Sequence, residues 1–434
     1  MYVSDTACDQ NSIAKTRSHH RHQSINQSAV LAPEKLDEHP EMSMTMLQSF
    51  TARTLSRRIH HCSIRQISFA RSKQMDDIDS PATRRSSPPP KDQLTFGTIM
   101  SPHMLTIEYK NGEWNDPVFQ AYKPLSLSPA AAGLHYGLQC FEGMKAYKAV
   151  SKKDGDGTST TIDDDDIRLF RPDKNMQRLS NSMERLHMPE GATTFDHQEL
   201  IACIAHLVRM DQEWIPAYGP GYSLYIRPTV VATDAALGLA APQSLLLYVI
   251  TCPVGAYYAN GIQPVRLTTD TPYVRAWPGG TGAHKVGGNY AGTIKAQAEA
   301  HGFDQVLWLH EKEQVTEVGS MNVFFVLDSG DGGVELVTPP LTRGDILPGV
   351  TRDSIVHLAQ EYDNVTVTER FPTMTELSAA AANGTLREAF GAGTAAVVLP
   401  IGCIHHQGRD INIPTGGPLT ARILDDIVSI QVRI

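Results

Sequence analysis

The stretch Gly-Gly-Thr-Gly-Ala-His-Lys-Val-Gly-Gly-Asn-Tyr, from Gly279 to Tyr290, places one lysine, Lys285, between two pairs of glycines. A lysine acts as a nucleophile only when its amine can lose a proton near neutral pH, which requires burial or a cationic neighbour. Glycines around it would let a bulky planar ligand approach the main chain. The segment therefore predicts an amine held for imine chemistry. On this pattern alone, the alternative is a solvated lysine in a glycine-rich turn.

The glycines around Lys285 do not form a phosphate-binding P-loop. That motif requires glycine directly before its lysine and serine or threonine directly after it. His284 and Val286 hold those two places. A nicotinamide-dependent dehydrogenase is also disfavoured, because no predicted strand is followed by G-x-G-x-x-G with an acidic residue about 20 positions further on.

Length and composition indicate an ordinary globular protein. With 434 residues, of which 41% are hydrophobic and 20% charged, the chain can form two domains with a sizeable core and a tail. A formal net charge of -9 gives no electrostatic reason to expect nucleic acid. The longest apolar run, around residues 244–250, is too short to span a bilayer and predicts a buried strand. We therefore expect neither nucleic acid nor a membrane as a partner.

The cysteines argue against a metal site. There are six, far apart and without a C-x-x-C pair: Cys8, Cys62, Cys140, Cys203, Cys252 and Cys403. Such spacing fits neither a zinc site nor a disulfide framework. We expect no metal and a reducing compartment.

Residues 1–95 form an N-terminal extension that is expected to be disordered. No acidic residue lies between Glu41 and Asp76, while arginines alternate with serines, threonines and apolar side chains. This composition is typical of a mitochondrial presequence, here at about residues 42–75, and the alternative is a disordered basic tail. The arginines are Arg53, Arg57, Arg58, Arg65 and Arg71.

The position of this presequence raises a question about the translation start. A presequence should begin at the N-terminus, yet a polar stretch with several acidic residues precedes it. Met42, Met44 or Met46 would each serve as a start. We expect a protein of the mitochondrial matrix, or a cytoplasmic one if the presequence is not used. The segment Asp79–Asp92, with its three successive prolines, predicts a disordered linker.

From about Phe96 the pattern changes to strand-like runs and amphipathic helices. The acidic run Asp163–Asp166 lacks the ligand spacing and turn glycine of a calcium site, so a solvated hairpin loop is expected there. The predicted strands are Met104–Tyr109, Met144–Tyr147, Ile167–Phe170, Ser223–Val231, Ser244–Thr251, Gln305–Leu309 and Val323–Leu327, and the predicted helices are Arg171–Leu186, Asp196–Asp211, Tyr290–Ala300 and one that opens after Gly349.

Several short motifs stand in an order that is similar to one family. Besides the Lys285 segment they are Phe96-Gly97, His135-Tyr136, Phe141–Lys145, Asn175–Arg178, Tyr225–Thr229, Thr316–Asn322, Leu347–Arg352 and Phe390–Ala395. Together they resemble the branched-chain amino acid aminotransferases, pyridoxal-phosphate enzymes of class IV and fold type IV, in their eukaryotic form. The resemblance runs from about Phe96 to the C-terminus. It implies a two-domain fold between the α+β and α/β classes, with a small domain at 96–258 and a larger one at 259–434 that carries the lysine.

The resemblance implies the roles of three residues at the cofactor ring. Lys285 would bind pyridoxal 5'-phosphate covalently and then move a proton at the substrate α carbon. Glu317 would lie against the pyridine nitrogen and keep it protonated. Tyr290 would hydrogen-bond the phenolic oxygen. Taken singly, Glu317 reads as a surface strand residue and Tyr290 as a core aromatic.

The resemblance also implies a phosphate site. Arg178 offers a guanidinium fork, and Val350 and Thr351 would open a helix whose free N–H groups favour an anion. Thr394 would serve from a second glycine-rich turn, and Ser320 stands where a threonine is common in the family. Taken singly, Arg178 reads as a helix-surface arginine and Pro348-Gly349 as an ordinary helix start.

A substrate pocket and a homodimer are implied as well. Aromatic walls would bury the branched side chain, and Arg227 would meet the side-chain carboxylate of glutamate. Tyr225 and the turn at Thr394-Ala395 would meet the α carboxylate, and Leu239 would be donated across a dimer interface. The aromatic residues are Phe96, Tyr136, Tyr225 and Tyr257. One departure is visible, because Ala396 and Leu399 occupy the places where mammalian relatives carry a C-x-x-C redox pair.

The expected activity is therefore a transamination. The amino group would pass between L-leucine, L-isoleucine or L-valine and 2-oxoglutarate, giving branched-chain 2-oxo acids and L-glutamate. The alternative within the same fold is a D-amino acid aminotransferase or an aminodeoxychorismate lyase. Arg227 with its partner Tyr225 argues against both.

Overall fold

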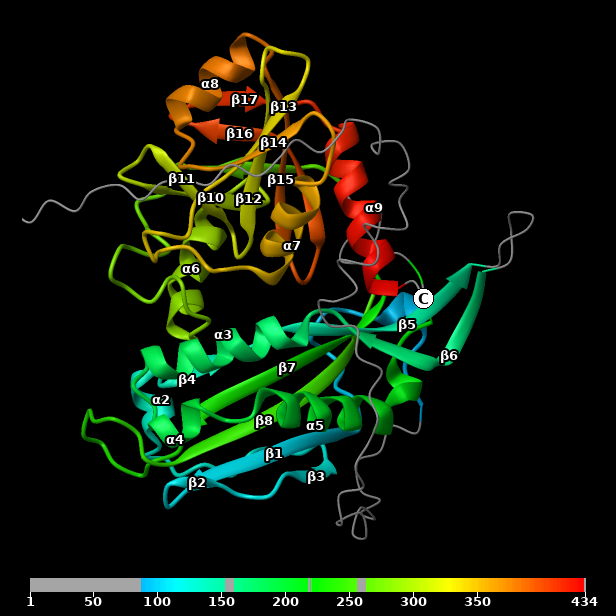
Figure 1. Ribbon diagram of the computed structural model, residues 1–434. Helices are drawn as coiled ribbons and strands as arrows, with labels where there is room; N and C mark the ends of the chain where they lie inside the picture. Colours follow the sequence, from blue (N-terminus) through cyan, green and yellow to red (C-terminus); the bar gives the residue numbers. More distant parts are fainter. Residues whose placement is uncertain (1–86, 153–159, 218, 220, 256–262, 433–434) are drawn as a thin grey trace, which may run out of the picture. The chain divides into compact units, whose positions relative to one another are not determined.

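The computed structural model describes residues 87–152, 160–217, 219, 221–255 and 263–432 (Figure 1). The chain divides into two units, residues 1–55 and 56–434, and every described residue belongs to the second. The presequence, most of the predicted linker and Tyr257 lie outside the described residues. The end of that linker is ordered, because Lys91–Gln93 form a short 3-10 helix, η1.

The first sheet is antiparallel throughout and has the strand order β2-β1-β8-β7-β5-β6, with β3 on β1 and β4 on β7. Helices α3 and α5 lie beside this sheet (Figure 1), and their apolar side chains form one core with it. Its strands are β1 (His103–Lys110), β2 (Glu113–Trp114), β3 (Val118–Ala121), β4 (Gln139–Phe141), β5 (Met144–Lys152), β6 (Thr160–Leu169), β7 (Ser223–Ala232) and β8 (Leu245–Val254), and the helices of this region are α2 (Ala132–Tyr136), α3 (Pro172–Arg185), α4 (Glu190–Thr193), α5 (His197–Met210) and the 3-10 helix η2 (Gln212–Trp214).

Helix α5 illustrates why these elements form where the sequence predicts them. Asp196 caps the helix, since its carboxylate accepts hydrogen bonds from the backbone N–H groups of Gln198 at 2.7 Å and Glu199 at 3.2 Å. The apolar positions that recur at helical spacing are buried against the sheet, as the period of the sequence predicts. They are Leu200, Ile204, Leu207 and Val208.

The second sheet is mixed, with the order β11-β10-β9-β16-β15-β12-β13-β14 and with β17 on β16. Parallel pairs join β9 to β10 and β16, and β13 to β14. Its strands are β9 (Val265–Thr268), β10 (Gln305–His310), β11 (Gln314–Val318), β12 (Asn322–Asp328), β13 (Val334–Thr338), β14 (Val365–Glu369), β15 (Leu386–Gly393), β16 (Val397–His406) and β17 (Arg409–Asn412), and its helices are α6 (Gly288–Glu299), α7 (Val350–Ala359), α8 (Met374–Ala382) and α9 (Pro418–Val432).

Strand β12 shows how this sheet is covered on both faces. Successive side chains of a strand point to opposite faces, and here both sets are buried. Phe325 belongs to the core that contains Leu377 of α8, whereas Phe324 belongs to the core that contains Ile355 of α7 and Ile423 of α9. The ribbon shows the same arrangement, with α8 on one side and α7 and α9 on the other (Figure 1). A continuous apolar strand is therefore buried between two helical layers.

Two predictions about local structure are wrong. The acidic run Asp163–Asp166 belongs to strand β6 instead of a loop. Asp163 pairs with Ala149 of β5, whereas the other three residues lie at a bulge where the register shifts between Lys148 and Ala149. Likewise Phe390–Gly393 ends strand β15, so the expected glycine-rich turn is reduced to the residues that follow. At β15, pairing with β12 and β16 overrides a composition that is unfavourable for strands.

The described helices are not suited to a membrane. None of them is both long enough and apolar enough to cross one.

Candidate active site

The lysine segment is attached by its backbone to the first sheet. The N–H of Lys285 donates to Ser182 Oγ of α3 at 2.9 Å, and the N–H of Phe141 donates to the carbonyl of Lys285 at 3.0 Å. A β carbon on Gly287 would lie 2.8 Å from the side-chain nitrogen of Gln139, so a larger residue there would have to displace that side chain. The segment is thereby held across the end of β4 instead of forming a free turn.

The amine of Lys285 faces an aromatic surface. Its Nζ donates to the hydroxyl of Tyr290 at 3.0 Å and lies 4.9 Å from the centre of the Phe141 ring. Arg227 covers the same ring, with its Cζ at 4.6 Å from the centre. The ring of Phe141 is therefore close to both the amine predicted to be reactive and the guanidinium predicted to bind substrate.

Glu317 is buried, so the reading of it as a surface strand residue is wrong. It lies on β11 with 1% of its surface exposed. Its Oε2 is 2.6 Å from Nη1 of Arg275, and its Oε1 accepts from Nδ2 of Asn322 at 3.3 Å. Burial raises the pKa of Glu317 to about 7, although Arg275, the backbone N–H of Leu347 and Lys285 act in the opposite direction.

One oxygen of this carboxylate remains available to a ligand. The contact of Oε2 with Arg275 is a close ion pair, but among the described residues Oε2 of Glu317 receives no hydrogen bond of good geometry. A buried oxygen that receives no hydrogen bond destabilises the folded protein unless a donor is supplied. A protonated ring nitrogen is such a donor.

Arg178 is also buried, so the alternative of a helix-surface arginine is wrong. Its Nε and Nη2 hold the two oxygens of Glu142 at 2.7 and 2.8 Å, and its Nη1 donates to the carbonyl of Pro348 at 2.9 Å. A guanidinium has five N–H donors, so one each on Nη1 and Nη2 is left for an anion. Arg178 thus connects α3 to the turn that precedes α7.

That turn begins a helix with free amide groups. Helix α7 starts at Val350, and its N-cap Gly349 supplies no side-chain cap. A small cavity of about 20 Å³ lies beside it, and Thr394 reaches the same cavity from the end of β15. The structure therefore brings Val350, Thr351 and Thr394 to one cavity. The cavity is also lined by Gly143, Met144, Lys145, Tyr147, Phe170, Asn175 and Gln431.

Lys145 is a second cation here, and the sequence assigns it no role. Its Nζ donates to the carbonyl of Ala395 at 2.8 Å, and burial lowers its pKa to about 8. In the sequence it is visible only as the last residue of the Phe141–Lys145 motif. The amine thus ties β5 to the turn in which Thr394 and Ala395 lie.

The residues predicted to bind substrate are partly assembled. Nη2 of Arg227 donates to the Tyr225 hydroxyl at 3.0 Å, and the ring of Phe96 packs edge-on against Tyr225 at 4.9 Å. Nε of Arg227 is buried and has no hydrogen-bond partner among the described residues. This leaves a donor for a carboxylate.

Other predicted residues are not brought to this centre within one chain. Tyr136 donates its hydroxyl to the carbonyl of Leu237 and is 41% exposed, and Leu239 in the same loop is 77% exposed. Ser320 is exposed in the turn between β11 and β12. Within the described part of the chain, no group of three or more His, Cys, Asp or Glu residues could hold a metal ion.

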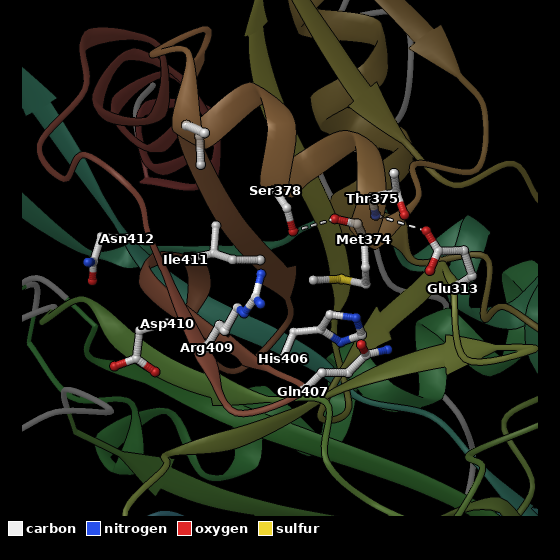
Figure 2. Close-up of a pocket in the computed structure, with 12 residues that line it drawn as sticks. Glu313, Met374, Thr375, Ser378, His406, Gln407, Arg409, Asp410, Ile411 and Asn412 are labelled. Atoms are coloured by element: carbon white, nitrogen blue, oxygen red, sulfur yellow. Dashed lines mark hydrogen bonds between the residues drawn. The ribbon is translucent and has the colours of Figure 1, made fainter.

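A larger groove of about 740 Å³ lies beside α8 and β17, and no predicted site residue lines it (Figure 2). Charges of both signs line its walls, among them Glu313, His406, Arg409 and Asp410. Glu313 already accepts from the backbone N–H of Thr375 at 2.8 Å. The groove presents no reactive group comparable to Lys285.

Comparison with known proteins gives consistent results. The family described as amino-transferase class IV matches residues 140–404. The chain is 48% identical to the branched-chain-amino-acid aminotransferase of Dictyostelium discoideum, over 79% of this chain and 87% of that protein. It is 44% identical to the cytosolic form of Mus musculus, over 82% and 89%, and 43% identical to the mitochondrial form, over 80% and 86%.

Solved structures of branched-chain amino acid aminotransferases are similar to this chain as well. The branched-chain amino acid aminotransferase from Escherichia coli superposes with a TM-score of 0.56 at 26% identity, covering 76% of this chain and 95% of that one. The T.th. branched-chain amino acid aminotransferase with pyridoxamine 5'-phosphate superposes with a TM-score of 0.56 at 28% identity, covering 75% and 94%.

Proposed function

The chain belongs to the class IV aminotransferases, among the branched-chain-amino-acid aminotransferases, and on that premise we propose that it exchanges amino groups between branched-chain amino acids and 2-oxoglutarate. The donors are L-leucine, L-isoleucine and L-valine, and the products are branched-chain 2-oxo acids and L-glutamate. The observation that carries the proposal is the amine of Lys285, held by Tyr290 at 3.0 Å beside the Arg227-covered ring of Phe141.

The enzyme uses pyridoxal 5'-phosphate, and its residues fit that group. Oε2 of Glu317, which is ion-paired with Arg275 but receives no hydrogen bond of good geometry among the described residues, suits a protonated ring nitrogen. The two remaining N–H groups of Arg178 suit a phosphate. When bound, the cofactor supplies an electron sink for negative charge at the substrate α carbon. In our proposal Val350, Thr351 and Thr394 complete the phosphate site, with Ser320 assigned by family resemblance alone.

The reacting proton is moved by the chain itself. Lys285 Nζ would hold the cofactor, and its amine, when free, would take the proton from the substrate α carbon. Tyr290 orients this amine by its hydrogen bond. Glu317 holds the proton on the ring nitrogen, because a carboxylate favours the charged form of a donor against it.

The substrate pocket has to accept both an apolar side chain and a carboxylate. We assign the apolar walls to Phe96, Tyr136, Tyr225 and Tyr257, and the charge to Arg227. Tyr225 and the turn at Thr394-Ala395 bind the α carboxylate. A D-amino acid aminotransferase or an aminodeoxychorismate lyase remains the alternative, and activity on D-alanine or aminodeoxychorismate above that on L-leucine would favour it.

Replacement of the lysine tests the proposed chemistry. Lys285→Ala should lower kcat for L-leucine with 2-oxoglutarate by more than ~100-fold, since the positioned base is removed. Tyr290→Phe, which keeps the amine, is the matched control and should retain measurable turnover. Circular dichroism checks the fold, and borohydride trapping checks covalent attachment of the cofactor. Near-normal transamination by the alanine variant would contradict the role of Lys285.

Replacement of the arginine tests the pocket. Arg227→Met should raise KM for glutamate by about 10–100-fold, because a hydrogen bond to a charged group contributes about 1.5–3 kcal/mol. KM for L-leucine, whose side chain carries no charge, should change much less. The two half-reactions are measured separately by single-turnover absorbance. Equal effects on both substrates would show that Arg227 does not select the carboxylate.

A homodimer completes the proposed site. Large exposed apolar side chains occur on α2 and on the loop after β7, with Leu134 at 60%, Leu237 at 66% and Leu239 at 77% exposure. Exposed apolar surface of this kind marks interfaces. Sedimentation velocity should show a dimer, and Leu239→Asp should weaken it, whereas Val274→Asp, at an exposed position outside this region, should not. A fully active monomer would disprove the assignment.

The proposed location is the mitochondrial matrix. The murine relatives include a cytosolic and a mitochondrial form. A presequence at about residues 42–75 would direct this chain to the matrix, and without its use the protein would stay in the cytoplasm. N-terminal sequencing of protein from isolated mitochondria should find a start after residue 42. A mature chain that keeps earlier residues would exclude this presequence.

A further inference from the structure

Glu317 can serve the cofactor ring only as an anion, and its surroundings work against that state. The side chain is almost completely buried, and burial, the largest cause, raises its pKa to about 7 even with Arg275 acting in the opposite direction. A neutral carboxyl group there would leave the proton on the carboxyl oxygen instead of on the ring nitrogen. The proposed role of Glu317 therefore requires a compensating positive charge.

The structure supplies this charge through Arg275. Its Nη1 lies 2.6 Å from Oε2 of Glu317, and the arginine is itself only 9% exposed. Arg275 belongs to the segment between β9 and α6, so it reaches Glu317 from outside the β10–β11 hairpin that carries the glutamate. Its Nη1 also donates to the carbonyl of Asp345 at 3.2 Å, which holds the guanidinium in place.

The remaining charges near Glu317 are accounted for. Lys285 lowers its pKa, but that amine takes part in the reaction and cannot be a constant source of charge. The charge of Asp345 raises the pKa of Glu317, but this carboxylate is itself paired with Arg343 at 2.8 Å. Asn322 contributes a neutral donor. Arg275 is thus the one cation, among the described residues facing Glu317, that the proposed chemistry leaves unchanged.

We propose that Arg275 is a positioning residue that keeps Glu317 ionised and so places the shared proton on the cofactor's ring nitrogen. It acts through Glu317 and touches neither substrate nor the reacting carbon. The inference rests on the proposed function of this site. It extends that function by assigning the electrostatic part of the ring site to a residue on a different segment.

A spectroscopic measurement tests this directly. The full chain is reconstituted with ¹⁵N-labelled pyridoxal phosphate, and the ring-nitrogen chemical shift is followed with pH by NMR. The wild type should show a protonated nitrogen at neutral pH. Arg275→Met should move the shift toward neutral pyridine and weaken cofactor binding by about 10-fold, as expected when a charge-assisted contact is lost. Arg275→Lys, which retains the charge, should restore most of the protonated signal.

Two controls separate positioning from a general structural effect. Arg370→Met removes an arginine that pairs with Glu335 and Glu376 and not with Glu317, and it should leave the ring-nitrogen signal unchanged. In a Glu317→Gln background, Arg275→Met should have no further effect, because coupled residues are non-additive. If Arg275→Met does not fold, Arg275→Gln takes its place.

The outcomes are distinguishable. A wild-type ring-nitrogen titration in the Arg275 variant, or an additive effect in the Glu317→Gln background, would overturn the role of Arg275 while leaving the transaminase proposal intact. If the wild-type chain itself neither bound the cofactor nor transaminated, both proposals would fall together.

Discussion

The clamp of Glu142 on Arg178 is the interaction on which the arrangement of the site depends. The carboxylate lies just after β4, the guanidinium lies on α3, and its third donor holds the carbonyl that precedes α7. A buried ion pair adds little net stability, because the desolvation of both charges offsets their attraction. Its contribution here is geometric, since it fixes the start of α7 relative to the first sheet.

The lysine segment, at the other side of the site, is also fixed to the first sheet and to α3, in this case by backbone hydrogen bonds. Its backbone is hydrogen-bonded to β4 and to Ser182 of α3, while its tyrosine opens α6 beside the second sheet. The backbone that carries the amine of Lys285, which we propose to be reactive, is therefore fixed without any ligand. Positions that must bring reacting atoms together within fractions of an ångström benefit from such support.

Much of the fold and of the site could be predicted from the sequence, for identifiable reasons. The period of apolar residues located α3 and α5 to within a residue or two, and the order of the motifs identified the family. The burial of Glu317 could not be predicted from the residues alone. Its partner Arg275 lies in a distant segment, and a single glutamate in a strand has no sequence signature. The strand at the acidic run in β6 was not predicted either, because aspartates are unfavourable in strands and most of this run lies at a bulge in the pairing with β5. The roles of individual site residues were taken from resemblance, and no periodicity could supply them.

Both parts of the chain, one with each sheet, supply residues to the proposed active site. Phe141, Arg178 and Arg227 come from the part of the chain before residue 256, whereas Lys285 and Glu317 come from the part after residue 262. Neither segment alone holds a full set of groups. The proposed site therefore requires groups from both parts, so two separate fragments could form it only if they reassociated.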